Sequence, residues 1–183
     1  RGELEADTDV LVARAEQVWA GIGYEADWQA QEELIAVRTA LDLFVLWHES
    51  RPDREVLATE LKFAAGLDIA EDSLAVNGVI DRLERDADGM LHIIDLKTQR
   101  TPPTAKEVVE HLQLSLYQLV GEEHVFDDQA ENNGVAGAEL VQLRNPVAKT
   151  GQPKVQVQVP VDVEAVKERL ADAVEIVRSE HFL

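Results

Sequence analysis

Two aspartates and a lysine lie inside apolar stretches of this chain, where charged side chains are unusual. Asp81 falls in the stretch 76–83, and Asp95 and Lys97 fall in the stretch 91–97. Successive side chains of a β-strand alternate between its faces, so Asp95 and Lys97 should share one face. If the two stretches pair as a hairpin, both carboxylates and the ammonium group come together in one small patch.

Such a patch needs a chemical reason, because strands disfavour aspartate and an unpaired buried charge is costly. Two carboxylates about 5 Å apart repel each other by roughly 3 kcal/mol at an effective dielectric constant near 20. A bound divalent cation converts that repulsion into attraction, and Mg²⁺ binds through one or two carboxylates together with phosphate and water oxygens. Lys97 would then orient a water molecule or offset the charge of a phosphate. The pattern therefore indicates metal-assisted phosphodiester hydrolysis.

A purely structural interpretation stands beside this one. Asp95 and Lys97 are also compatible with an ion pair on an exposed strand, worth about 0–1 kcal/mol. A lone D-x-K sequence is usually structural. The upstream Asp81 and the helix expected after the hairpin favour the metal site instead.

Three motifs follow one another along the chain: G-V-I-D-R at residues 78–82, D-L-K-T at residues 95–98 and Q-L-S-L-Y at residues 113–117. In this order they resemble the RecB-type branch of the PD-(D/E)XK nucleases. The resemblance implies that Asp81 and Asp95 are metal ligands, that the Leu96 carbonyl is a backbone ligand and that Lys97 is the catalytic lysine. It also implies Mg²⁺ or Mn²⁺ as the cofactor.

The resemblance extends to residues outside the central pair. Glu60 matches the catalytic glutamate on the preceding strand, and Gln113 and Tyr117 would lie on the helix that borders the DNA and the site. Without the resemblance, these last two would be incidental polar residues of an amphipathic helix. Arg100 follows the D-L-K-T motif, where it could contact a phosphate, although a solvated loop arginine explains it nearly as well.

One feature of the RecB-type pattern is absent from the sequence. These nucleases commonly carry a metal-binding histidine in a G-x-x-x-H context on an upstream helix, and none of the five histidines fits that context. The chain opens at Arg1 rather than at methionine. We therefore expect it to be part of a longer protein in which the histidine lies upstream.

Composition sets the outer limits of the interpretation. At 183 residues, with 45% hydrophobic and 29% charged residues, the chain fits one globular nuclease domain. It has no cysteine and no apolar run long enough for a membrane span, so we expect a cytoplasmic protein without membrane contact. Its net charge of −19 repels a polyanion. An acidic nuclease makes sense when a helicase domain, in the same or a partner chain, delivers the DNA to it.

The hydrophobic periodicity predicts an α/β fold with an N-terminal helical lobe over residues 1–52 and a nuclease core over residues 53–183. In the core we expect a restriction-endonuclease-like central mixed sheet flanked by helices. Gly89 should close the central hairpin, and Thr104 should cap one continuous helix. The expected helices cover residues 5–19, 28–49, 105–120 and 162–179, and the expected strands cover residues 56–67, 76–83, 91–97, 138–144 and 154–161.

The function predicted from these features is DNA cleavage by the nuclease module of a helicase–nuclease in double-strand break repair. Two other classes stay open. The domain could be an inactive nuclease fold that binds DNA or a partner subunit, although the intact D…D-x-K pattern argues against decay. It could also be an acidic protein-interaction module whose likeness to nucleases is accidental.

Overall fold

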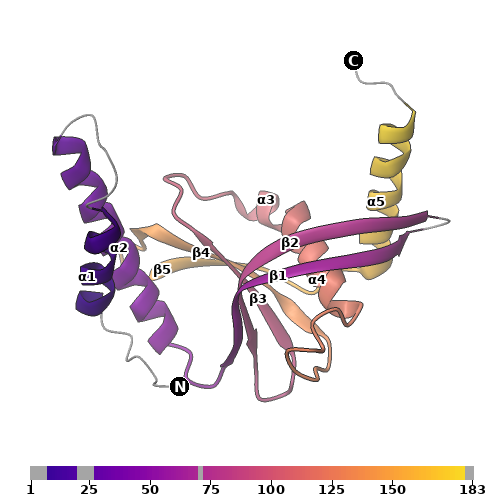
Figure 1. Ribbon diagram of the computed structural model, residues 1–183, viewed down its shortest axis with the longest axis horizontal. Helices are drawn as coiled ribbons and strands as arrows, with labels where there is room; N and C mark the ends of the chain where they lie inside the picture. The colour runs from indigo at the N-terminus through magenta and orange to yellow at the C-terminus, as the bar shows by residue number, and fades with distance from the viewer. Residues whose placement is uncertain (1–7, 20–26, 70–71, 180–183) are drawn as a thin grey trace. The chain divides into compact units, whose positions relative to one another are not determined.

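The computed structural model describes residues 8–19, 27–69 and 72–179 (Figure 1). In the described residues, two helices, three strands, two helices, two strands and a final helix follow one another, which makes an α/β protein. The elements are α1 (Thr8–Trp19), α2 (Asp27–Glu49), β1 (Glu55–Ile69), β2 (Asp72–Arg85), β3 (Leu91–Lys97), α3 (Ala105–Val109), α4 (Leu112–Glu122), β4 (Val135–Pro146), β5 (Pro153–Gln158) and α5 (Val163–Arg178).

The chain divides into two compact units, and each is built from several segments. One unit comprises residues 1–52, 96–102 and 141–155, and the other comprises residues 53–95, 103–140 and 156–183. In the first unit, α1 packs on α2 and Arg38 forms a 2.7 Å ion pair with Asp9. These two helices are the expected N-terminal pair. Trp47 of α2 is buried, so it packs in the core, and the side chain of Trp28 lies outside the described residues.

The five strands form one mixed sheet in the order β1-β2-β3-β4-β5. β1 pairs with β2 and β2 pairs with β3, both antiparallel. Gly89 adopts a φ of +79° in the turn between β2 and β3, so the predicted hairpin is confirmed. β1, β2 and β4 are longer than the predicted segments, β3 has the predicted bounds, and β5 ends three residues before the predicted end at residue 161.

The core of the second unit lies between the sheet and helices α3, α4 and α5. Its fully buried residues come from both layers, with Ile80 and Ile93 on the strands and Leu114 and Leu119 on α4. The helix side is completed by the N-terminal half of α5. The C-terminal half of α5 does not contribute to this core, because Val177 is 59% exposed.

The helix predicted over residues 105–120 is wrong in one respect: it is two helices, α3 and α4, separated at His111. Thr104 caps α3 as predicted, in a reciprocal capping box with Glu107. The His111 side chain then caps α4 by accepting a hydrogen bond from the Leu114 amide. The Gln158 side chain of β5 donates to three carbonyls around the break, those of Val108, Val109 and His111.

The break also changes which side chains face the core. Leu112, the first residue of α4, is 46% exposed, whereas Leu114 is fully buried. Among the described residues, no helix is both long enough and apolar enough to cross a membrane.

The turn of the hairpin yields a prediction about pH. One Asp86 oxygen accepts the Asp88 and Met90 amides, and the other lies 2.8 Å from Nε2 of His92. The hydrogen bond with His92, aided by those amides, lowers the pKa of Asp86. An aspartate with a lowered folded-state pKa stabilises the fold above its unfolded-state pKa near 3.9, and this contribution is lost as the pH falls through the folded-state pKa.

We therefore expect Asp86→Ala to lower the free energy of unfolding by about 1 kcal/mol at pH 6, and by clearly less at pH 3. Urea denaturation of both proteins at the two pH values measures this difference. An equal loss at both pH values would show that the carboxylate charge does not stabilise the turn.

Candidate functional site

The two aspartates predicted as metal ligands lie where β2 and β3 stop pairing. The last residue pair between these strands is Arg82 with Ile94. Because the strands are antiparallel, Asp81 and Asp95 are the residues directly beyond this last pair, one on each strand. Figure 1 shows β2 continuing beyond this point beside β1, as a long two-stranded ribbon toward α5. The predicted hairpin register therefore places both carboxylates at a fork in the sheet.

Burial and donor chemistry at this fork suit a hard divalent cation. Asp95 is only 5% exposed and Asp81 is half-buried. Within the part of the chain that the structure describes, no three His, Cys, Asp or Glu side chains gather as a metal cluster. Mg²⁺ accepts such a sparse set, because it binds through one or two carboxylates and keeps water or phosphate oxygens as its other ligands. The aspartate pair fits Mg²⁺ or Mn²⁺ better than a metal that needs an all-protein cage.

Three predicted site residues belong to the other compact unit. Leu96 and Lys97 complete β3, and both are half-buried. Lys97 lies two residues after Asp95 in the sequence and is the last residue of β3. Arg100 is exposed in the loop that follows, and its carbonyl accepts a 2.8 Å hydrogen bond from the Asn145 side chain.

Glu60 has an unusual backbone on β1. The strand pairs with β2 on both sides of it, through Thr59 with Arg82 and Leu61 with Ile80, yet Glu60 itself has a φ of +51°. Its side chain is exposed and completes no three-residue metal cluster with the aspartates. A left-handed conformation in a residue other than glycine is uncommon, and such residues concentrate at functional sites. The catalytic role of Glu60 stays a prediction.

Gln113 and Tyr117 lie on α4 and contact each other. The Gln113 side-chain nitrogen donates to the Tyr117 hydroxyl over 2.8 Å. The Tyr117 hydroxyl in turn donates to the Val79 carbonyl over 2.9 Å, only two residues before Asp81. The structure thus connects the third sequence motif with the first.

Two groups near the fork were not singled out from the sequence. Phe63 packs edge-to-face on Tyr117, with ring centroids 5.7 Å apart. Arg82 is buried and forms a 2.6 Å ion pair with the buried Glu84. Phe63 carried no signal beyond strand-like hydrophobicity. Arg82 and Glu84 could have been found, because an arginine and a glutamate two residues apart in an apolar strand share one face and indicate a buried ion pair.

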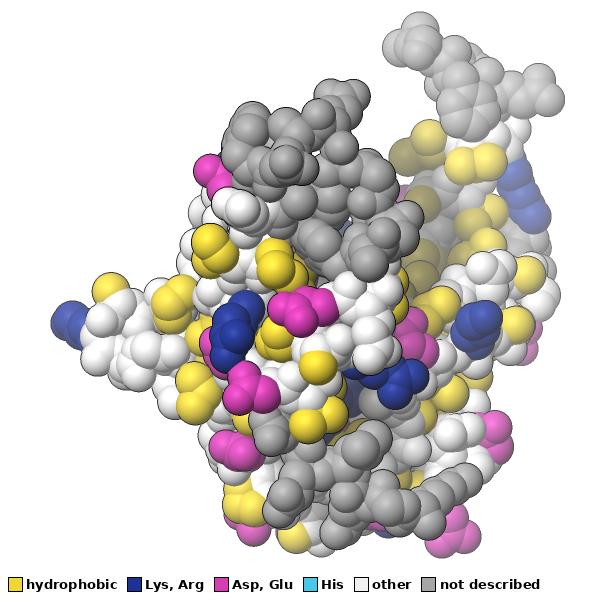
Figure 2. Space-filling model, turned by 60° about the vertical axis from the view of Figure 1, so that its left-hand side comes forward, with side chains coloured by type: hydrophobic (Ala, Val, Ile, Leu, Met, Phe, Trp, Pro, Cys, Tyr) yellow, Lys and Arg dark blue, Asp and Glu magenta, His cyan; other side chains and the backbone are white. Residues whose placement is uncertain are grey.

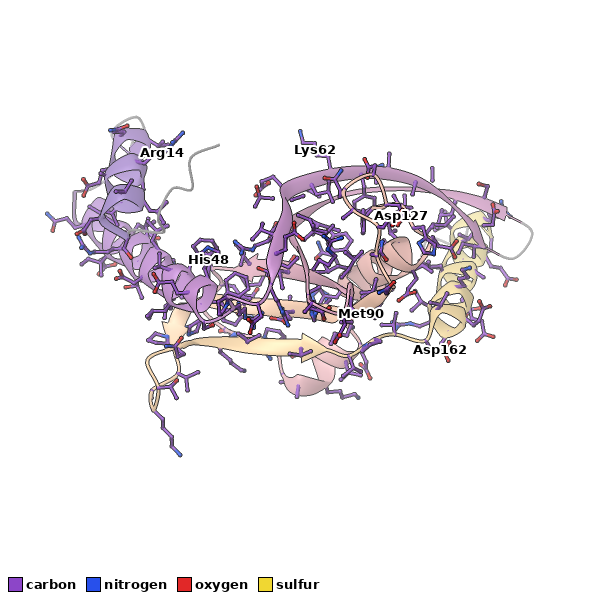
Figure 3. The ribbon with its side chains drawn as sticks, turned by 90° about the horizontal axis from the view of Figure 1, so that it is seen from below. Arg14, His48, Lys62, Met90, Asp127 and Asp162 are labelled. Atoms are coloured by element: carbon purple, nitrogen blue, oxygen red, sulfur yellow. The ribbon has the colours of Figure 1, made fainter. Side chains whose placement is uncertain are left out.

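The described charges on the face shown in Figure 2 do not collect by sign. Lysine and arginine side chains lie singly there among acidic and apolar ones. On β1, Lys62 is exposed and points away from the strand into solvent (Figure 3). The view agrees with the net charge of −19 and gives no reason to expect strong intrinsic affinity for a polyanion.

Comparison with known proteins places this chain in a family. A family model described as the PD-(D/E)XK nuclease superfamily matches residues 1–182. No curated protein matches the chain. Among solved structures, one titled "Crystal structure of SSO0001" aligns with 94% of this chain and 72% of its own, at 14% sequence identity and a TM-score of 0.45. Because the family model spans nearly the whole length, the chain belongs to the PD-(D/E)XK nuclease superfamily. The predicted fold class is confirmed.

The positive φ of Glu60 allows the effect of its backbone on stability to be tested separately from the effect of its carboxylate on cleavage. An L-residue with positive φ destabilises the fold by roughly 1–2 kcal/mol, and glycine avoids this penalty. Fixing the backbone of glycine on folding costs about 0.5–1 kcal/mol of conformational entropy instead. Glu60→Gly should therefore leave the free energy of unfolding unchanged, or raise it by up to about 1 kcal/mol. Glu60→Val should lower it by about 1–2 kcal/mol, because a β-branched residue tolerates positive φ poorly.

Denaturation curves of both variants check the backbone argument, and the same stability loss in both would contradict it. Cleavage assays on the stable Glu60→Gly protein then test the carboxylate alone. Full activity in that variant would remove Glu60 from the catalytic residues.

Proposed function

We propose that the protein is a deoxyribonuclease that uses Mg²⁺ or Mn²⁺ to hydrolyse phosphodiester bonds. One observation carries the proposal: Asp81 and Asp95 lie together directly beyond the last residue pair of β2 and β3. Membership of a nuclease superfamily supports it. The order of the three motifs, which resembles RecB-type nucleases, supports it further.

In this proposal Asp81 and Asp95 hold the metal ion through their carboxylates, with the Leu96 carbonyl as a backbone ligand. When bound, the metal polarises the scissile phosphate and lowers the pKa of a coordinated water. Lys97 orients the attacking water and offsets negative charge that develops on the phosphate. Water adds to phosphorus, the bond to the leaving sugar oxygen breaks, and that oxygen takes up a proton. Arg100 contacts a neighbouring phosphate of the strand.

We further propose that this chain is the nuclease module of a helicase–nuclease that acts in DNA double-strand break repair. The proposal is supported by the resemblance to RecB-type nucleases and by the net charge of −19. A nuclease with this charge gains DNA through a tethered partner, since tethering supplies a high effective concentration without intrinsic affinity. The helicase domain, in the same or a partner chain, then delivers the strand.

The first test removes one metal ligand at a time. Asp81→Ala and Asp95→Ala should each abolish Mn²⁺-dependent cleavage of single-stranded and duplex DNA, because one remaining carboxylate leaves the cation weakly held. Asp128→Ala, which removes an exposed aspartate of the loop after α4, serves as the control and should cleave normally. Unwinding by a joined helicase should persist in all three variants. Cleavage above a small fraction of the wild-type rate in either ligand variant would contradict the assignment.

The second test separates a catalytic Lys97 from a structural one. Lys97→Ala should lower the cleavage rate by about 10²–10⁴-fold, the usual contribution of a positioned proton-transfer group. Its free energy of unfolding should change by no more than about 1 kcal/mol. Lys97→Arg should restore only part of the rate, because a broad guanidinium does not replace a compact ammonium group. Lys62→Ala, which removes an exposed lysine, is the matched control. Unchanged rates in Lys97→Ala would exclude the catalytic role.

A further inference from the structure

The fork that holds the aspartates leaves part of β2 with a single strand neighbour. β2 pairs with β3 only over Arg82 to Arg85, whereas its pairing with β1 continues to Asp72. Beyond Arg82, β2 continues beside β1, and both Val79 and Asp81 lie in this continuing part of the strand.

A side chain of α4 anchors this part of β2. The Tyr117 hydroxyl donates a 2.9 Å hydrogen bond to the Val79 carbonyl, and it accepts a 2.8 Å hydrogen bond from the Gln113 side chain. A phenol has one proton to donate. That proton is engaged on β2, so Tyr117 does not donate to a substrate phosphate in this arrangement.

The Tyr117 ring is held in place by close packing on the same strand. Tyr117 is only 7% exposed and lies edge-to-face against Phe63, at an interplanar angle of 88°. Phe63 pairs with Gly78 across β1 and β2. A Cβ atom added at Gly78 would lie 2.9 Å from two Phe63 ring carbons and 3.2 Å from a Tyr117 ring carbon. Contacts this short mean that the two rings occupy the space of a side chain at position 78.

We propose that Tyr117 is a positioning residue that anchors β2 to α4 two residues before Asp81 and thereby holds Asp81 beside Asp95. Phe63 and Gly78 fix its ring, and Gln113 fixes its hydroxyl. Tyr117 thus acts on cleavage through the backbone of β2 and not through contact with the substrate. The catalytic part of this inference rests on the proposed nuclease function, whereas the structural part does not.

The decisive variant is Tyr117→Phe, which keeps the ring against Phe63 and removes only the hydroxyl. Its matched control is Ser115→Ala, because Ser115 is a 2% exposed residue of the same helix whose hydroxyl bonds to His111 and Gln158 instead of β2. Gly78→Ala is a second test variant, since its methyl group would displace both rings from the strand.

Native-state hydrogen exchange tests the structural part without any activity. In Tyr117→Phe and Gly78→Ala, amide exchange over residues 79–82 should be at least about tenfold faster than in the wild type, because local opening becomes easier. In Ser115→Ala, exchange over this segment should match the wild type. Unchanged exchange in Tyr117→Phe, or the same acceleration in Ser115→Ala, would overturn the proposal.

Steady-state cleavage with Mn²⁺ tests the catalytic part. Tyr117→Phe should lower kcat by about 10–100-fold with KM for DNA within about twofold, since a misplacement of the order of 1 Å can cost 10²-fold. Ser115→Ala should keep the wild-type kcat. A rise in KM alone would overturn the proposal by showing direct substrate contact. Absence of cleavage by the full-length wild-type protein would instead refute the proposed function, and hydrogen exchange would still decide the role of Tyr117.

Discussion

The parting of β2 from β3 is the constraint on which the rest of the second unit depends. A strand that loses a neighbour exposes backbone donors and acceptors on one side, and these must be satisfied by something else. Here the residue pairs end at Arg82 and Ile94, directly before the two aspartates. The fold thereby places two carboxylates directly beyond the end of a ladder.

The paired side of the fork is reinforced by buried charge. Glu84 is 1% exposed and lies between Arg82, at 2.6 Å, and Arg54, at 3.5 Å, while Arg54 also reaches Glu139 of β4 at 2.8 Å. The two arginines balance the two glutamates. A buried network of this kind adds little net stability over apolar packing, but removing one member leaves an uncompensated charge that costs about 3–5 kcal/mol. The network therefore favours one register of β2, and with it one position for Asp81.

The sequence predicted the local features well because they depend on neighbouring residues. The turn at Gly89 and the cap at Thr104 follow from backbone and side-chain chemistry within a few positions. The break at His111 could not be predicted in this way. Its free carbonyls are satisfied by Gln158, which is 47 residues away from His111 in the chain. The φ of +51° at Glu60 is equally non-local, since strand-like neighbours on both sides gave no sign of it.

At the site, the types and order of the residues were enough to predict the two aspartates. They did not predict which contacts hold the strands that carry those aspartates. The spacing of Gln113 and Tyr117 predicted one helix face, whereas the Val79 carbonyl as the Tyr117 acceptor required the folded chain. Gly78 shows the limit most clearly. In the sequence it was only one position of a motif. The structure shows why a glycine stands there, because a Cβ atom at this position would collide with two aromatic rings.

The net charge of −19 acts on a different length scale from the site. At physiological ionic strength the screening length is about 8 Å, so most surface carboxylates contribute little to the potential at the fork. In the proposed function, a metal ion bound between two carboxylates is the dominant local charge and attracts phosphate regardless of the distant surface. Under the same proposal, global repulsion slows and weakens the encounter with DNA, whereas the chemistry after encounter depends on the few groups around Asp81 and Asp95. An acidic surface and a phosphodiester substrate are compatible in one protein when another module controls the encounter.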